Sequence, residues 1–288
     1  MANLPNNNFT PNTLSLHAGY DYDSQRTLSV PIYQSTAYSF ENANQAAARF
    51  GLAELGNIYS RLTNPTVDML AKRLAAVEGG AFGVATASGS SALFYSLVNL
   101  AQNGDNIAYS NKIYGGSQTL LVHVLKRFGI EGRVFDIDNL STLEKIIDDK
   151  TKAIFFESLS NPQIAIADVK TITDIAKKHK IATICDNTVA TPILYRPFDF
   201  GVDISVHSLT KYINGHGSGL GGAVIEREGL NELIKGNPRY PAFNTPDESY
   251  HGLVYANLPL PIFSIRIITE WLRNIGATLS PRNAWIHF

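Results

Sequence analysis

Strand-like and helix-like segments alternate along most of this chain, and the alternation constrains the fold more than any other feature. The apolar spacing predicts helices over 66–78, 91–101, 117–128 and 169–179. Short apolar runs predict strands at 81–87, 107–110, 133–137, 152–157, 181–185, 203–207 and 223–226. Strands that alternate with helices connect through right-handed crossovers into a mostly parallel sheet. The chain therefore has the pattern of an α/β protein.

The remaining segments divide the 288 residues into three predicted parts. Residues 1–60 are rich in Asn, Tyr and Ser and helix-like only at 44–50, so we expect an extended arm that packs on a neighbouring subunit. Residues 61–257 form the predicted large domain. Residues 258–288, with a predicted helix at 262–275, begin a small C-terminal α+β domain that this chain does not complete.

Three local patterns add detail to this outline. The tetrad Ser141–Glu144 has the sequence of a capping box and predicts a helix that ends near Asp148. The segment 236–246 is rich in Gly, Asn and Pro and predicts a long loop. With the small domain incomplete, a further alternative is a chain that cannot fold alone, because the apolar segment 262–268 is left uncovered.

The composition excludes several classes of protein. Hydrophobic residues make up 44% and charged residues 17%, which is typical of a folded globular chain. The 24 Lys and Arg residues balance 25 Asp and Glu residues without a basic stripe, so we expect no nucleic-acid partner. The sequence shows neither a leader pattern nor an apolar run of membrane length, so we expect a cytoplasmic protein with no membrane contact.

The sequence argues against three kinds of site. Cys185 is the sole cysteine, which rules out a disulfide framework or a multi-thiolate zinc site and fits a reducing compartment. The seven histidines show no metal-ligand spacing, so we predict no metal. The run Gly217–Gly222 matches a dinucleotide-binding pattern, but it precedes a strand instead of joining a strand to a helix.

Polar residues follow several of the predicted strands. In open α/β sheets the ligand crevice lies beyond the carboxyl ends of the strands, so these segments are the candidates for a site. The four segments are Ser88–Ser91, Tyr114–Ser117, Asp186–Thr188 and Ser208–Lys211.

Each candidate allows a functional and a plain structural interpretation. Ser88, Gly89 and Ser90 open a helix and suit a phosphate, although Ser88 or Ser90 could simply cap that helix. Lys211 could be a solvated surface charge. Its place between an apolar strand and a glycine-dense loop favours a partly desolvated amine nucleophile. Asp186 could cap a turn or face Lys211 from a neighbouring strand.

Taken together, these residues meet the needs of one cofactor. A phosphate cradle with the added hydroxyls of Ser208 and Thr210, the Lys211 amine, the Asp186 carboxylate and a stackable Tyr114 describe a site for pyridoxal 5'-phosphate (PLP). A carboxylate keeps the pyridine nitrogen protonated and makes the ring an electron sink.

The same motifs resemble the Cys/Met-metabolism family of PLP-dependent enzymes. The resemblance runs from about Leu14 to Pro281. It implies fold type I, an aspartate-aminotransferase-like large domain with a mostly parallel seven-stranded sheet. The motifs that carry it are Gly56–Arg61 with Asn64–Thr66, Glu78–Gly80, Tyr114–Gly116, Asn161-Pro162, Asp186–Thr188 and Ser208–Lys211.

The resemblance also implies a role for each site residue. Lys211 would hold PLP as a Schiff base, Asp186 would bind the pyridine nitrogen, and Tyr114 would stack on the ring. Further cofactor contacts would come from Ser88, Gly89, Ser90, Asn161, Thr188, Ser208 and Thr210. In this family Tyr59 and Arg61 reach the phosphate of the neighbouring subunit, which implies a dimer that shares active sites, usually paired into a tetramer.

The implied reaction belongs to sulfur amino-acid biosynthesis. The segments His17–Gly19, Pro31–Gln34, Phe243–Pro246 and Ser249–Gly252 resemble the branch of the family that replaces the acetate of O-acetyl-L-homoserine with sulfide or a small thiol. The products would be acetate and L-homocysteine or methionine. Three alternatives remain open: a cystathionine γ-synthase, a γ-lyase that splits methionine, and a PLP-binding fragment without turnover. The family's substrate-carboxylate arginine has no match among Arg266, Arg273 and Arg282.

Overall fold

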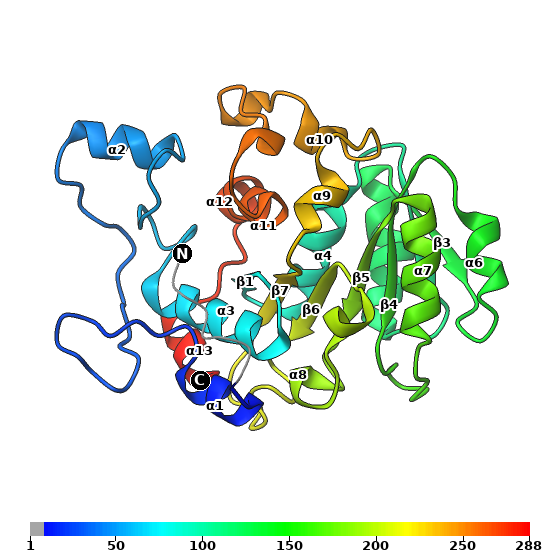
Figure 1. Ribbon diagram of the computed structural model, residues 1–288, viewed down its shortest axis with the longest axis horizontal. Coiled ribbons are helices and arrows are strands. Elements are labelled where there is room, and N and C mark those ends of the chain that lie inside the picture. The colour runs from blue at the N-terminus through cyan, green and yellow to red at the C-terminus, as the bar shows by residue number, and fades with distance from the viewer. Residues whose placement is uncertain (1–8) are drawn as a thin grey trace.

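The computed structural model describes residues 9–288, so residues 1–8 of the predicted arm lie outside the described residues. Its centre is one seven-stranded sheet in the order β1-β7-β6-β5-β4-β2-β3 (Figure 1). β7 runs antiparallel to β1 and β6, and the other pairs are parallel, which confirms the predicted mostly parallel sheet. The strands are β1 Phe82–Thr86, β2 Asn106–Ser110, β3 Glu131–Phe135, β4 Thr151–Glu157, β5 Ala182–Asp186, β6 Ile204–Ser208 and β7 Gly222–Glu226.

The helices connect these strands and surround the sheet. The longer ones are α2 Ala43–Phe50, α3 Pro65–Glu78, α4 Gly89–Leu100 and α7 Val169–His179. Two helical stretches are continuous but change type, α5 Gly115–Thr119 with η1 Leu120–Val124 and η2 Leu125–Phe128, and α11 Ile262–Arg266 with η6 Ile267–Leu272 and α12 Arg273–Ile275. The shorter helices are α1 Pro11–His17, α6 Ser141–Ile146, α8 Thr191–Leu194, η3 Pro197–Phe200, α9 Leu230–Ile234, α10 Pro241–Asn244, η4 Glu248–Tyr250, η5 Tyr255–Asn257 and α13 Pro281–Ile286.

Helices cover both faces of the sheet. On one face, Leu97 of α4 and Phe263 of α11 pack with Ile184 and Val206 of the central strands. On the opposite face, Ile172 of α7 packs against β4 and β5, and α3 covers β1 and β7. The central strands are therefore buried on both sides, as their near-continuous apolar runs require.

The ends of α3 show how the sequence sets these elements. The Asn64 side chain accepts the N–H of Thr66 at 3.0 Å, and Pro65 occupies the first helical turn, where its missing N–H costs nothing. Gly79 ends the helix with a φ of 81°, a left-handed conformation that glycine adopts without strain. These signals confirm the predicted helix and turn the chain directly into β1.

Three local predictions were wrong. The capping box at Ser141 does not form, because the cap position of α6 is Leu140 and the Ser141 hydroxyl instead donates to Asn139 Oδ1 at 2.7 Å. The arm contains α1 as well as α2, since Thr10 caps a helix that Pro11 begins. The predicted loop 236–246 includes the short helix α10. The alternative of an uncovered segment 262–268 does not hold, because this segment is largely buried against the main core.

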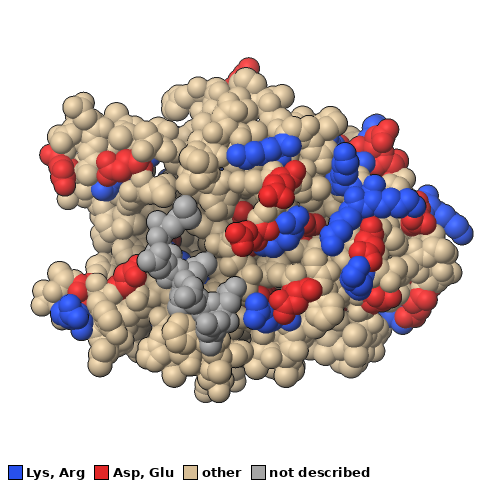
Figure 2. Space-filling view, in the orientation of Figure 1, with Lys and Arg blue, Asp and Glu red and all other residues tan. Residues whose placement is uncertain are grey.

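In the part of the chain that the structure describes, no helix is both long and apolar enough to cross a membrane. Figure 2 shows acidic and basic side chains interspersed on one face of the molecule. A group of ion pairs contributes to this pattern, including Lys178 with Glu144 at 2.7 Å.

Candidate active site

A cavity of about 800 Å³ opens at the carboxyl ends of the parallel strands. Four separate segments that the sequence analysis selected meet in its wall, together with Asn161. The predicted residues that line it are Ser88, Gly89, Ser90, Tyr114, Asn161, Asp186, Thr188, Ser208, Thr210 and Lys211. The sheet topology brings them together because parallel strands end at one edge.

The turn between β1 and α4 forms one wall. The Ser88 hydroxyl accepts the N–H of Ser91 at 3.2 Å, and the Ser91 hydroxyl accepts the N–H of Ser88 at 3.1 Å, so the side chain of Ser88 caps α4. A Cβ atom added to Gly89 would lie 2.6 Å from Ser208 Cβ. The turn therefore touches the end of β6 so closely that no side chain fits at Gly89, and the helix N-terminus is left open to an anion.

The ends of β5 and β6 form the floor. Asp186 Oδ1 accepts the N–H of Thr188 at 2.9 Å, and the Thr188 hydroxyl accepts the N–H of Ser208 at 2.8 Å. Burial raises the pKa of the Asp186 carboxyl, and the hydrogen bonds from Thr188 and the charge of His207 partly oppose this rise. A carboxylate held in this way would be stabilised by a cationic N–H donor in the cavity.

Lys211 lies at the mouth of the cavity. Its backbone N–H bonds Ser208 O at 3.2 Å, and its carbonyl accepts the N–H of Gly215 at 2.8 Å. The side chain is exposed in this chain, so the predicted partial desolvation of Lys211 was wrong. Lys211 forms no ion pair with any residue from 9 to 288.

The hydroxyl of Thr210 forms hydrogen bonds within the chain. It accepts the N–H of Gly221 at 3.1 Å and donates to the Gly221 carbonyl at 3.3 Å. Thr210 therefore pins the glycine loop against the end of β6, and the residue still lines the cavity.

Glu157 is a site residue that the sequence analysis missed. It ends β4, is 6% exposed, and accepts the N–H of Tyr114 at 2.6 Å and the N–H of Asn161 at 2.9 Å. Burial, together with the nearby charge of Asp186, raises the pKa of Glu157 to about 7. The signal in the sequence is a carboxylate that ends an apolar strand, whereas the predicted site included only residues that follow the strands.

Tyr59 and Arg61 do not line the cavity of their own chain. The Arg61 guanidinium lies 5.2 Å from the centre of the Tyr59 ring, and the Arg61 carbonyl accepts the Thr278 hydroxyl at 2.9 Å. Their predicted role concerns the cavity of a second subunit and stays a prediction.

The cavity fits PLP on its own geometry. The close contact at Gly89 leaves a helix N-terminus for a phosphate, and Asp186 offers a largely buried carboxylate for a protonated ring nitrogen. Lys211 offers an amine without an ion-pair partner among the described residues. No cluster of three or more potential metal ligands was found in the same described part of the chain.

This fold and this set of residues define the PLP-dependent enzymes of fold type I. The chain belongs to the family of Cys/Met metabolism PLP-dependent enzymes, whose sequence profile matches residues 12–288.

Two curated relatives show where the chain stands within the family. It is 43% identical over 277 residues to O-acetyl-L-homoserine sulfhydrylase of Corynebacterium glutamicum, covering 95% of this chain and 63% of that protein. It is 40% identical over 288 residues to the enzyme of the same name from Leptospira meyeri, covering 96% of this chain and 64% of the relative. The chain thus spans less than two thirds of the length of these relatives.

Solved structures agree with this assignment. A crystal structure from Campylobacter jejuni, assigned as an O-acetylhomoserine (thiol)-lyase, is 68% identical with a TM-score of 0.96, over 97% of this chain and 69% of that one. It contains a pyridoxyl-lysine phosphate residue. Cystathionine γ-lyase of Lactobacillus plantarum is 30% identical with a TM-score of 0.77, over 97% of this chain and 62% of that one.

Proposed function

We propose that this chain is the cofactor-binding part of an enzyme that performs γ-replacement on O-acetyl-L-homoserine. Sulfide or a small thiol replaces acetate, and the product is L-homocysteine or methionine. The observation that carries the proposal is the match to the Campylobacter jejuni structure at 68% identity over 97% of this chain. The identity to the Lactobacillus plantarum γ-lyase is much lower, at 30%.

The residues of the cavity would divide the work as follows. When bound, PLP supplies an electron sink for carbanion chemistry. Lys211 Nζ would hold the cofactor at rest and then accept the α proton of the substrate amino acid. Asp186 would bind the ring nitrogen and keep its proton in place. The Tyr114 ring, which is 51% exposed at the cavity wall, would stack on the cofactor.

The phosphate would lie at the N-terminus of α4. Gly89 and Ser90 would offer backbone N–H groups there, and Ser208 would add its hydroxyl from the adjoining end of β6. Ser88, Thr188 and Thr210 are already hydrogen-bonded within the chain, so we assign them to shaping the cavity. Asn161, whose N–H is fixed by Glu157, would lie near the phenolic oxygen of the ring.

We also propose that two copies share their cavities. Tyr59 and Arg61 would reach the phosphate in the partner's cavity from the arm 1–60, and dimers would pair into tetramers in the cytoplasm. The arrangement is supported by the position of Tyr59, which is 42% exposed and does not line the candidate cavity of its own chain. In the same proposal, residues 61–257 form the large domain and 258–288 begin the small one.

A substrate panel tests the reaction. The chain is assayed as it stands and fused to the remaining part of the Campylobacter jejuni homologue, with O-acetylhomoserine, O-succinylhomoserine and methionine, each with and without sulfide. We expect homocysteine and acetate from O-acetylhomoserine with sulfide. Faster turnover of O-succinylhomoserine, or release of methanethiol from methionine, would replace this proposal with one of the sister reactions.

The concentration dependence of PLP binding tests the shared cavity. Apparent PLP affinity is measured over a dilution series of the chain, with sedimentation in parallel, for the wild type and Arg61→Ala. Wild-type affinity should rise as dimers form, and Arg61→Ala should remove most of that rise. Equal curves for the two proteins would show that Arg61 serves no partner cavity.

A further inference from the structure

A buried ion pair lies behind the floor of the cavity. The His207 Nε2 atom is 2.9 Å and 3.0 Å from the two carboxylate oxygens of Glu78, and both side chains are completely buried. Ser205 donates its hydroxyl to Glu78 Oε1 at 3.0 Å, and Asn187 Nδ2 donates to the same oxygen at 2.9 Å. Removing two charges from water is costly, so such a pair is weak evidence for stability and calls for another explanation.

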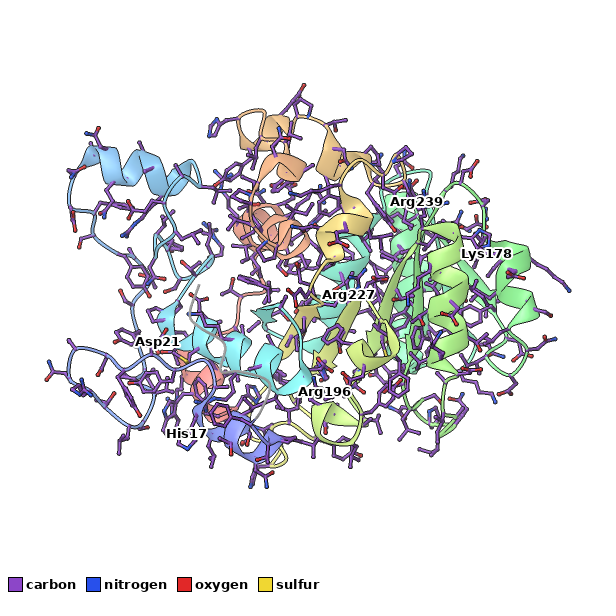
Figure 3. The ribbon with its side chains drawn as sticks, viewed as in Figure 1. His17, Asp21, Lys178, Arg196, Arg227 and Arg239 are labelled. Carbon is purple, nitrogen blue, oxygen red and sulfur yellow. The ribbon has the colours of Figure 1, made fainter. Side chains whose placement is uncertain are left out.

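The pleat of the strands places this pair opposite the cavity. Val206 and Ser208 of β6 face α4 and the cavity, so the alternate residues Ser205 and His207 face α3, where Glu78 ends its helix. Figure 3 shows Arg196 beside this end of α3, and its Nε donates to the Glu78 carbonyl at 3.1 Å. The pair therefore sits directly behind the strands whose ends carry Asp186 and Ser208.

The network is joined to Asp186 through the backbone. Asp186 pairs with Val206, the neighbour of His207, and Asn187 follows Asp186 while its side chain binds Glu78. Asn187 Oδ1 also accepts the Ser158 hydroxyl at 2.7 Å, and the Ser158 N–H donates to the Asp186 carbonyl at 3.0 Å. One set of hydrogen bonds thus fixes the ends of β4, β5 and β6 together.

The charge of the pair also reaches Asp186. The pKa of His207 is raised by the charge and hydrogen bond of Glu78 against the opposing effect of burial. The Nδ1 atom of His207 has no hydrogen-bond partner among the described residues, so the hydrogen bond to Glu78, with the charges of Glu78 and Asp186, favours a proton on this ring. His207 in turn favours the ionised form of Asp186 across the sheet.

We propose that Glu78 and His207 form a positioning pair that keeps Asp186 ionised and correctly placed to bind a protonated heteroaromatic nitrogen. Both act through Asp186 and neither touches the ligand. The inference rests on the proposed role of Asp186 in cofactor binding, and it adds two residues on the far side of the sheet to the site.

The test compares Glu78→Gln with Glu226→Gln. The first substitution keeps an oxygen that can accept from Asn187 and Ser205 but removes the charge that holds the proton on His207. Glu226 is a matched control, because it is a 2% exposed carboxylate of β7 that accepts two hydrogen bonds from Ser264 at the opposite end of the strands. The readouts are the dissociation constant for PLP and the ¹⁵N resonance of PLP labelled at the pyridine nitrogen.

We expect the PLP dissociation constant of Glu78→Gln to rise about tenfold, because an Asp186 carboxylate that loses the favourable charge of His207 binds a protonated ring nitrogen less tightly. Its ¹⁵N resonance should move toward that of an unprotonated pyridine, and Glu226→Gln should change neither value. Wild-type affinity and resonance in a folded Glu78→Gln protein would overturn the proposal. Neither readout uses O-acetylhomoserine, so a failed turnover assay leaves this result intact.

A second variant tests the proposal if Glu78→Gln does not fold. Replacing a whole buried ion pair with apolar residues is often neutral for stability, so Glu78→Met with His207→Leu removes both charges without leaving one unpaired. The double variant should lose PLP affinity to the same extent and show the same ¹⁵N shift. Retained wild-type values in this protein would equally overturn the inference.

Discussion

The carboxylate of Glu157 accepts the backbone N–H of Tyr114 at 2.6 Å, and its second oxygen accepts the N–H of Asn161 at 2.9 Å. One strand-end side chain therefore fixes the two loops that are predicted to stack on the cofactor and to lie near its phenolic oxygen. Tyr114 and Asn161 are both exposed at the cavity wall. The hydrogen bonds to the buried Glu157 carboxylate therefore hold the backbone of these two loops in place.

The stability of the apo-protein should fall as the pH rises through about 7. Burial raises the pKa of Glu157 from its ordinary value of 4.5 to about 7, so the folded state holds this proton more tightly than the unfolded state. The contribution is complete below pH 4.5 and is lost as the pH rises through 7, with a limit on the order of 3 kcal/mol. Thermal unfolding from pH 5 to pH 8 measures it.

Glu157→Gln should flatten this pH profile, because an amide does not ionise. Glu226 has a pKa raised to about 7 for the same reason, so a residual slope should persist in the variant. Glu248→Gln, at an exposed position, controls for the removal of one acidic residue. An unchanged slope in Glu157→Gln would show that Glu157 ionises freely in the folded protein.

Gly89→Ala should damage the phosphate end of the cavity. The new Cβ atom would lie 2.6 Å from Ser208 Cβ and 2.8 Å from Ser208 Cα, so the turn before α4 must move. We expect a loss of about 1–3 kcal/mol in the free energy of unfolding and weaker PLP binding. Gly115→Ala is the matched control, since its Cβ would meet no atom within 4 Å. Denaturant unfolding and PLP titration measure both effects. Equal stability and equal PLP affinity in the two variants would contradict the prediction.

Substitutions of Ser88 and Ser90 should affect different properties, because Ser88 caps α4 and Ser90 is proposed to bind the phosphate. Ser88→Ala removes the cap of α4 and should cost about 0.5–2 kcal/mol of stability in the apo-protein. Ser90 is exposed in the cavity wall, so Ser90→Ala should leave stability unchanged and weaken PLP binding severalfold. The same two measurements, unfolding and PLP titration, decide the matter. A stability loss in Ser90→Ala would reverse the two assignments.

Lys211 should be the lysine that PLP labels. Wild-type protein is incubated with PLP, reduced with borohydride and digested, and we expect the pyridoxyl mass on the peptide that contains Lys211. Lys211→Ala should carry no stoichiometric label, whereas Lys170→Ala, at an exposed position on α7, should be labelled like the wild type. A dominant label on another lysine would show that Lys211 is not the lysine that binds PLP covalently.

Much of this protein could be read from the order of its residues. The alternation of strands and helices, the Asn64–Pro65 start and Gly79 end of α3, and the polar strand ends are local signals that do not depend on the rest of the chain. They were enough to predict the mostly parallel sheet and the four polar segments that meet in its cavity, because parallel strands bring their carboxyl ends to one edge.

The tertiary structure alone decided the details that depend on contacts between distant segments. Ser141 bonds its neighbour Asn139 and does not cap α6, the Lys211 side chain remains exposed, and Glu157 turns from a strand residue into an anchor for two loops. The buried pair of Glu78 and His207 joins residues that are 129 positions apart. Hydrogen bonds and burial of this kind depend on which segments the folded chain brings together, and the local sequence around each residue does not indicate its distant partner.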